Sequence, residues 1–219
     1  MAMNPATTAP RLMIVADLAY AGAEKRLLEA IEALAPVAGD PRVAIQLRAK
    51  EIDAARLERL ARAAREREPE AALLVLNGDA GLAARLGYGG VHWPERNIPA
   101  RRPSAPRWQS AAVHSLETLR RAEEAGMNAA VFGSVFVPGS KPGEAAGLEA
   151  LSAVAGAARI PVIAIGGVTP DRVTACVDAG AHGVGVVSGI LGALDPAEAA
   201  GRYLAALEAQ AAARAEAGS

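Results

Sequence analysis

The stretch Ile163-Ala-Ile-Gly-Gly-Val168, followed by Thr169-Pro170, joins an apolar strand to the start of a helix through two glycines. Short runs rich in Val, Ile and Leu recur along the chain, and longer stretches with helical spacing lie between them. This alternation predicts units of one strand and one helix arranged around a parallel sheet.

The pattern predicts eight strands. They are expected at residues 11–17, 43–48, 72–77, 89–93, 108–113, 129–136, 162–167 and 183–189. Helices are expected at residues 22–34, 51–66, 80–86, 115–125, 147–158, 170–179 and 195–208. We therefore predict a single (β/α)8 barrel, the TIM barrel of the α/β class. An open doubly wound sheet is the rival fold, but it usually has a glycine-rich first turn, which is missing after Asp17.

The length of 219 residues suits one barrel and is too short for two enzyme domains. Residues 1–10 are expected to be disordered or extended, residues 11–208 to form the barrel, and residues 209–219 to extend the last helix or to fray. The connection 94–107 contains four prolines, so we expect an irregular loop there rather than a helix.

The charge balance indicates a small-molecule ligand. The 23 basic and 24 acidic side chains leave no excess positive field to attract nucleic acid or an anionic membrane. Cys176 is the only cysteine, which excludes an internal disulfide and fits a reducing compartment. No apolar run approaches the length of a membrane span, and no secretion signal is recognisable, so a cytoplasmic protein is expected.

Polar residues at the end of strand 43–48 form a first candidate binding site, because working residues of such barrels lie at the C-terminal ends of strands. The period of two directs Gln46 and Arg48 inward near the rim, and the apolar residues between them outward to the helices. Lys50 follows on the same side, so the three side chains form a donor cluster for phosphate or carboxylate. A solvated loop with a salt bridge to a neighbouring acid is the alternative.

Glycines at the ends of the last two strands form a second candidate site, for phosphate. The bare backbone N–H groups of Gly166 and Gly167 can approach an anion closely. The last strand runs through Ser188 and Gly189 into a candidate short helix at 190–192, and a short helix after strand eight binds phosphate in this fold.

A third glycine-rich stretch, Pro138-Gly-Ser-Lys-Pro-Gly143, follows the sixth strand. We expect it to be a loop that closes over the ligand, with Ser140 beside Lys141, the one cation of the stretch. An ordinary exposed turn is the alternative, because Pro and Gly are common in turns.

The three histidines differ in their expected roles. His114 directly follows strand five and is the best candidate for proton transfer, because imidazole changes its charge near neutral pH. His92 ends strand four and is expected to fill the top of the barrel through a hydrogen bond, while His182 lies at the opposite face and is expected to be structural. No pair has the spacing of metal ligands and Cys176 has no activating neighbour, so neither a zinc site nor thiol catalysis is expected.

These residues resemble the thiamine phosphate synthase superfamily from about residue 43 to residue 200. Gln46-Leu-Arg-Ala-Lys50 is similar to its phosphate-binding signature, and Ala164-Ile-Gly-Gly-Val-Thr-Pro170 and Val187-Ser-Gly-Ile190 resemble its phosphate cup. Gly133 to Lys141 resembles its loop ending in lysine. The resemblance and the strand-end pattern together imply these binding residues: Gln46, Arg48, Lys50, Asn77, Ser140, Lys141, Gly166, Gly167, Val187, Ser188 and Gly189.

Two positions depart from the synthase pattern. The synthases have Asn-Asp after strand three and an aspartate five residues beyond the strand-four histidine, and these two aspartates hold magnesium. This chain has Asn77-Gly78 and Asn97 there, with Asp79 displaced by one residue. Because magnesium prefers hard anionic ligands, no metal site is expected.

The sister branch of thiazole tautomerases lacks that metal requirement, and Ala112-Val-His-Ser115 and Gly139-Ser-Lys-Pro-Gly143 resemble its segments. This resemblance implies an isomerase without cofactors that aromatises a carboxythiazole phosphate by proton transfer through His114. One alternative is a thiamine phosphate synthase that uses magnesium to join hydroxymethylpyrimidine diphosphate to thiazole phosphate. Another is a non-catalytic paralogue that binds thiazole or thiamine phosphate. The expected partner is a phosphorylated thiazole. A homo-oligomer and a monomer are both consistent with the sequence.

Overall fold

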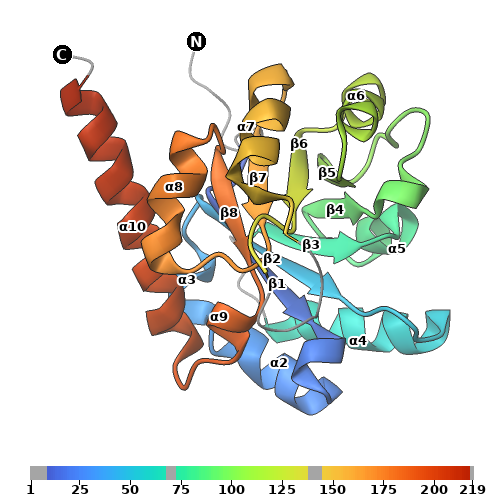
Figure 1. Cartoon of the computed structure of the whole chain (residues 1–219). Coiled ribbons are helices and arrows are strands. Elements are labelled where there is room, and N and C mark those ends of the chain that lie inside the picture. Colours follow the sequence, from blue (N-terminus) through green and yellow to red (C-terminus); the bar gives the residue numbers. More distant parts are fainter. Residues whose placement is uncertain (1–8, 68–72, 138–144, 218–219) are drawn as a thin grey trace, which may run out of the picture.

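A closed barrel of eight parallel strands forms the centre of the molecule (Figure 1). The computed structural model describes residues 9–67, 73–137 and 145–217. Each strand pairs with the next, and the eighth pairs with the first, so the predicted single (β/α)8 barrel is confirmed. The strands are β1 (Leu12–Asp17), β2 (Val43–Arg48), β3 (Leu73–Asn77), β4 (Gly90–Trp93), β5 (Trp108–Val113), β6 (Ala129–Gly133), β7 (Val162–Ile165) and β8 (Gly183–Val186).

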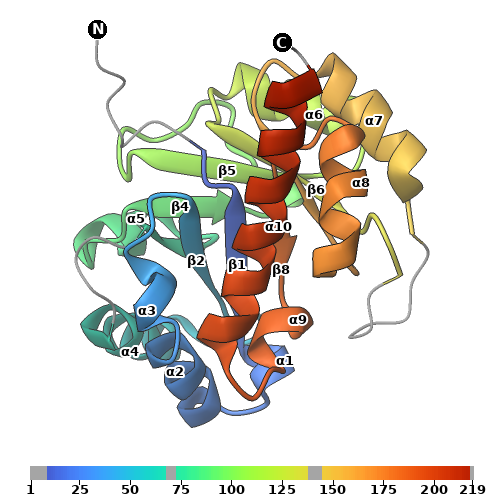
Figure 2. The same cartoon turned by 90° about the vertical axis from the view of Figure 1, so that its left-hand side faces the viewer.

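Helices surround the barrel and connect successive strands (Figure 1). They are α1 (Leu18–Ala21), α2 (Glu24–Glu32), α3 (Ala35–Ala38), α4 (Ala54–Arg67), α5 (Ala80–Arg85), α6 (Leu116–Glu124), α7 (Gly147–Ala157), α8 (Val173–Asp178), α9 (Ser188–Leu191) and α10 (Pro196–Ala217), with the 3-10 turns η2 (Glu95–Asn97) and η3 (Pro170–Arg172). The 22 residues of α10 run along the outside of the barrel and pack on α3, α8 and α9 (Figure 2).

Side chains alternate along the strands and create two apolar cores. Val43, Ile45 and Leu47 of β2 pack in the outer core against the helices, as predicted. The inner core fills the barrel and contains Met13, Val15, Ala44, Val75, Trp108, Ala129, Val131 and Ile163. Gly90 makes room for Trp108, since a Cβ there would lie 2.9 Å from the indole ring. Because packing closes the interior, a ligand has to bind above it.

The last three strands end earlier than predicted. β6, β7 and β8 stop at residues 133, 165 and 186, whereas the sequence pattern extended them to residues 136, 167 and 189. Gly166 and Gly167 have φ of 99° and 62°, which is not a strand conformation. α9 begins at Ser188, two residues before the expected short helix. The glycines predicted at strand ends therefore belong to loops above the barrel.

The connections contain two helices that the sequence pattern did not predict. α1 and α3 have four residues each, about one turn, which is too short to show a helical period. The connection 94–107 is irregular apart from the turn η2, as predicted. Gln109 holds this loop, because its Nε2 donates to the carbonyl oxygens of Pro103 (2.7 Å) and Pro106 (2.9 Å).

The C-terminal segment continues α10 through residue 217, so the expected extension is helical where the structure describes it. Gln210 Nε2 donates to Asp178 Oδ1 at 2.9 Å, and Arg214 Nη2 donates to the Val177 carbonyl at 2.6 Å. These bonds attach the extension to the C-terminal end of α8. The expected N-terminal arm lies mostly outside the described residues. Within the described ranges, no helix is both long enough and apolar enough to span a bilayer.

Candidate ligand-binding site at the mouth of the barrel

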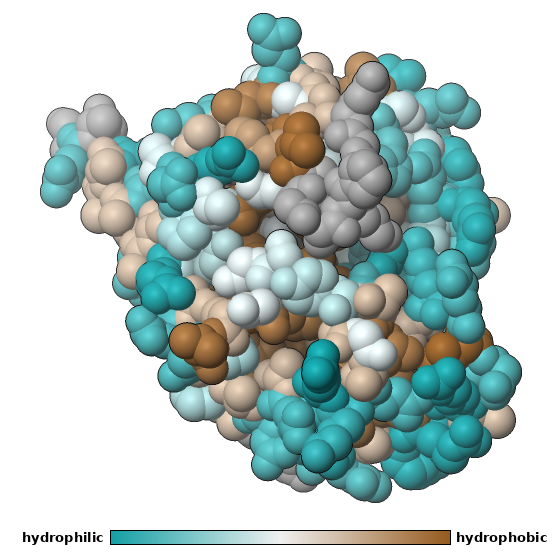
Figure 3. All heavy atoms as spheres, turned by 60° about the horizontal axis from the view of Figure 1, so that its bottom comes forward, coloured by the Kyte–Doolittle hydropathy of each residue, from teal (hydrophilic) through white to brown (hydrophobic). Residues whose placement is uncertain are grey.

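A cavity of about 430 Å³ opens at the C-terminal ends of the strands. Residues from β1, β2 and β4 to β8 line it, together with residues of α1 and α9. Figure 3 shows this face of the molecule, where hydrophobic side chains lie in a recess among paler and hydrophilic ones. The cavity occupies the position at which (β/α)8 enzymes carry their active sites.

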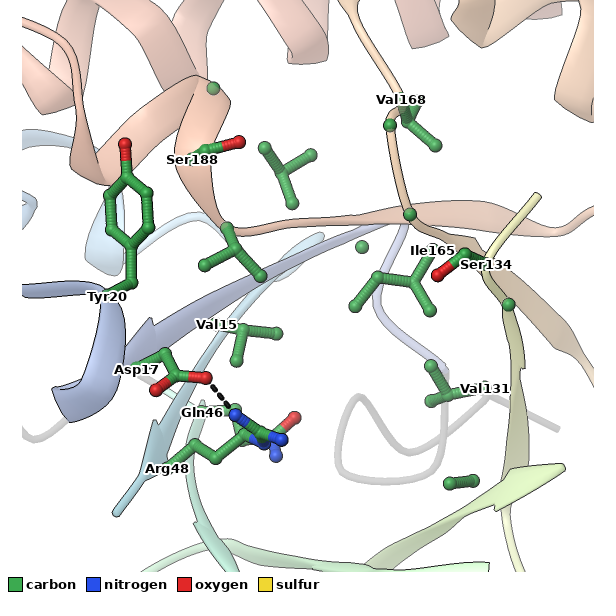
Figure 4. A pocket seen from close by; sticks show the side chains of 18 of the residues that line it. Val15, Asp17, Tyr20, Gln46, Arg48, Val131, Ser134, Ile165, Val168 and Ser188 are labelled. Carbon is green, nitrogen blue, oxygen red and sulfur yellow. Dashed lines mark hydrogen bonds and ion pairs between the residues drawn. The ribbon is translucent and has the colours of Figure 1, made fainter. Parts of the chain in front are cut away.

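Arg48 lines one side of the cavity and forms an ion pair with Asp17 (Figure 4). The two residues end adjacent strands and stand opposite each other in the β1–β2 register. Asp17 is buried, and its second oxygen accepts from the Ala19 backbone N–H at 2.9 Å, which caps α1. Sequence reasoning missed Asp17, although an acid at the end of the first strand was a visible signal. This pair is the salt bridge given above as the alternative for Arg48, but it lies inside the cavity.

Two hydrogen-bonded pairs each contribute one side chain, Gln46 or His92, to the lining of the cavity. Gln46 Nε2 donates to Asn77 Oδ1 at 3.1 Å, and His92 Nδ1 lies 2.8 Å from Ser110 Oγ. Burial lowers the pKa of His92 to about 3, and the positive charges of Arg48 and a neighbouring lysine act in the same direction. His92 is therefore neutral at physiological pH and fills the top of the barrel through a hydrogen bond, as predicted.

The glycine loops lie on another side of the cavity, where Figure 4 shows Ser188 and Val168. A Cβ at Gly166 would lie 2.5 Å from Ser134 Cβ, and one at Gly167 would lie 2.6 Å from the Val137 carbonyl oxygen. The glycine pair therefore lets the segment after β6 pack directly on the loop after β7. From the sequence, these glycines are expected to let a ligand anion come close to the backbone. The structure shows that they also let the segment after β6 come close to the same backbone.

Two side chains outside the cavity hold these loops. The guanidinium of Arg172 lies 4.7 Å from the centroid of the Phe136 ring, and its Nη1 donates to the Gly167 carbonyl at 2.7 Å. Tyr203 of α10 donates its hydroxyl to the Val168 carbonyl at 3.1 Å and packs so closely on Gly189 that a Cβ there would lie 2.2 Å from the hydroxyl oxygen. Neither contact could be predicted from sequence spacing.

His114 follows β5 and lines the rim of the cavity, with 59% of its side chain exposed. Its Nδ1 contacts Glu95 Oε2 in the turn η2. Its backbone N–H donates to Thr118 Oγ1 at 3.1 Å, within the capping box that begins α6. The imidazole is thus placed where proton transfer to a bound ligand is geometrically feasible.

The carboxylates near the cavity do not fit a magnesium ion. Gly78 and Asn97 stand at the two positions where the synthase resemblance expects aspartate, and Asp79 caps α5 by accepting from a backbone N–H at 2.8 Å. Among the described residues that line the cavity, Asp17 is the only acid, and it is paired with Arg48. In the parts of the chain that the structure describes, no group of three or more His, Cys, Asp or Glu is arranged to hold a metal.

The structure brings most of the predicted residues together. Gln46, Arg48, His114, Gly166, Gly167, Val187, Ser188 and Gly189 line the cavity. Asn77 is not part of the lining but accepts a hydrogen bond from Gln46, which is. Lys50 is exposed beyond the end of β2 and is not part of the lining. Ser140 and Lys141 lie outside the described residues. His182 is at the opposite end of the barrel, as predicted, with Nε2 3.0 Å from the Ala9 carbonyl oxygen.

The fold and the cavity define a class of protein: a (β/α)8 barrel with a cavity at its strand ends that is lined in part by glycine loops. Within that class, a family model described as thiamine monophosphate synthase matches residues 12–190. The chain therefore belongs to the thiamine monophosphate synthase family, and the resemblance seen in its motifs is confirmed.

Several proteins similar to this chain are named as thiamine-phosphate synthases or a thiamine phosphate pyrophosphorylase. The thiamine-phosphate synthase of Moorella thermoacetica is 37% identical over 166 residues, which cover 73% of this chain and 79% of that protein. The thiamine-phosphate synthase of Anaeromyxobacter dehalogenans is 38% identical over 189 residues, covering 84% and 85%. The solved thiamine phosphate pyrophosphorylase from Pyrococcus furiosus has a TM-score of 0.75 and 26% identity, covering 94% of this chain and 99% of that one. These names favour the synthase alternative over the tautomerase prediction.

Proposed function

We propose that this protein is a thiazole tautomerase, an isomerase that aromatises a carboxythiazole phosphate by moving a proton. One observation supports the proposal: among the described residues that line the cavity there is an imidazole at the rim, but the one acid is paired with Arg48, and no group of three or more described His, Cys, Asp or Glu residues is arranged to hold a metal. Tautomerisation needs a proton-transfer group and a hold on the phosphate. Transfer from a diphosphate also needs neutralisation of the leaving group.

The ligand phosphate is proposed to bind the backbone amides of Gly166, Gly167, Ser188 and Gly189. The short helix α9 directly after β8 supports this position, because its first N–H groups have no partner within the helix. A crystal structure with bound thiazole phosphate tests the placement. Phosphate at the N-terminal face of the barrel, or on the loop with Arg101 and Arg102, would contradict it.

The ligand carboxylate is proposed to lie toward Gln46 and Arg48, on a different side of the cavity. In that orientation the ring lies near His114, which removes the proton from ring carbon C2 or protonates the exocyclic carbon. The proton lost by one carbon equals the proton gained by the other, so no further reactant is required. Asn77 orients Gln46 through the 3.1 Å hydrogen bond.

A thiamine phosphate synthase is the second candidate, because the named relatives at 37–38% identity are synthases. For this candidate the pyrimidine diphosphate would have to bind and react without the two aspartates expected from the synthase pattern. It predicts product formation only when the pyrimidine diphosphate is present.

The deciding experiment is incubation of the protein with the thiazole carboxylate tautomer, with and without pyrimidine diphosphate and magnesium, while both products are followed. A tautomerase forms the aromatic thiazole carboxylate in every mixture. A synthase forms thiamine phosphate only in the complete mixture. Ligand binding without either product would indicate the non-catalytic paralogue and would overturn the proposal.

A further inference from the structure

The contact between Glu95 and His114 joins two elements that are each fixed by their own hydrogen bonds. Glu95 begins the turn η2, in which Asn97 N donates to the Pro94 carbonyl at 2.8 Å. Ile98 directly after the turn is 9% exposed and packs in the outer core. The backbone that carries the Glu95 carboxylate is therefore held in place beside the cavity.

The backbone of His114 is held as firmly. Thr118 Oγ1 accepts from the N–H groups of His114 and Ser115, each at 3.1 Å, and Val113 before them is buried. The freedom that remains is rotation of the imidazole about its side-chain bonds. Glu95 Oε2 contacts Nδ1 and so restricts this rotation. The Glu95 side chain is 30% exposed against 59% for His114, so the carboxylate is the less accessible member of the pair.

We propose that Glu95 is a positioning residue that fixes the tautomer and the orientation of His114. A carboxylate can only accept, so this contact requires the proton on Nδ1. Nε2 then carries the lone pair and is the nitrogen available to take a proton from a ligand in the cavity. When Nε2 is protonated, the carboxylate stabilises the imidazolium, as the acid of a catalytic triad does for its histidine. The inference rests on the proposed function in one respect, that His114 transfers the proton.

A structural role alone does not account for the pair. Exposed ion pairs contribute little to folding stability, because solvent screens them and both side chains lose freedom. Removing the Glu95 carboxylate is therefore expected to leave the fold intact. The capping box around Ser115 and Thr118 is independent of Glu95.

The test compares wild type with Glu95→Ala and Glu95→Gln, and uses Glu117→Gln as the matched control. Glu117 is an exposed acid in the first turn of α6, close to His114 in sequence. Nitrogen NMR of the full-length protein reports which ring nitrogen of His114 carries the proton. We expect Nδ1–H in the wild type and the control, and a shift toward Nε2–H, the tautomer preferred by free imidazole side chains, in Glu95→Ala.

Kinetics with the thiazole carboxylate tautomer give the second readout. We expect kcat of Glu95→Ala to fall about 10–100-fold, with KM changed much less, since the carboxylate acts through His114 and not on the ligand. An unchanged tautomer in Glu95→Ala, or a tautomer shift with undiminished kcat, would overturn the role of Glu95. If the wild type shows no tautomerisation while the tautomer shift is present, the proposed function fails and the positioning of His114 by Glu95 stands.

Discussion

His92 makes the stability of the barrel depend on pH. Its imidazole is buried against Ser110, with a pKa lowered from 6.5 to about 3. Below pH 6.5 the unfolded chain binds a proton on this histidine that the folded chain does not, so stability falls as pH decreases from about 6.5 toward 3. For this residue alone the loss between pH 7.5 and pH 5 is about 2 kcal/mol.

The His92→Gln variant, which keeps a hydrogen-bonding side chain of similar size, removes this dependence. Urea unfolding of both proteins at pH 7.5 and pH 5 measures it, because all other titrating groups are shared. We expect the difference in unfolding free energy between wild type and variant to change by about 2 kcal/mol in favour of the variant at the lower pH. Parallel pH profiles would show that the pKa of His92 is not lowered in the folded protein.

His114 is the residue on which the proposed chemistry depends. Glutamine at this position keeps the size and some hydrogen bonding but cannot take up a proton. We expect His114→Gln to lower the tautomerisation rate by about 10²–10⁴-fold. The affinity for a thiazole phosphate, measured by calorimetry, should stay unchanged because the phosphate is proposed to bind the loops after β7 and β8, whereas His114 follows β5. A variant with nearly wild-type turnover would assign proton transfer to another group, such as the carboxylate of the substrate.

The loops after β6 and β7 behave as one element, because three kinds of contact join them. Val135 N and Phe136 N donate to the carbonyls of residues 165 and 166 at 2.9 and 3.0 Å, and the glycine pair lies against residues 134–137. Arg172 then binds across both loops, with its guanidinium over Phe136 and its Nη1 on the Gly167 carbonyl. The conformation of Gly166 and Gly167 is therefore set partly from outside the cavity.

Replacing Arg172 by Ala should weaken phosphate binding without contact between residue 172 and the ligand. A cation–π contact of this kind contributes about 0.5–1 kcal/mol, and a hydrogen bond adds about the same. We expect about a tenfold loss of affinity for thiazole phosphate, or about 1.4 kcal/mol, by calorimetry. Arg202→Ala is the control, since Arg202 forms an exposed i,i+4 pair with Glu198 on α10. Equal affinities for the two variants would show that the contact of Arg172 with these loops does not hold the binding site.

For the molecule as a whole, the sequence predicted what depends on local periodicity. The strand cores, the inward face of Gln46 and the glycine loops all follow from a period of two and from residues next to one another in the chain. The pairs Asp17–Arg48 and Glu95–His114 join residues 31 and 19 positions apart, so they depend on how elements meet in space. The predicted ends of β6, β7 and β8 were wrong because apolar residues beside glycine have the sequence pattern of a strand. Only the backbone conformation shows that the strands have already ended there.

Ligand binding at the site as a whole is expected to be independent of metal ions. Gly78 and Asn97 supply no carboxylate, Asp79 caps α5, and Asp17 is paired with Arg48, so magnesium would find no set of hard anionic ligands in the described cavity. We expect calorimetric titration with thiazole phosphate to give the same dissociation constant in magnesium and in EDTA. An affinity loss of about tenfold in EDTA, about 1.4 kcal/mol, would mean that a metal ion takes part in binding. That result would restore the synthase candidate, because a metal bound beside the ligand could neutralise a leaving diphosphate.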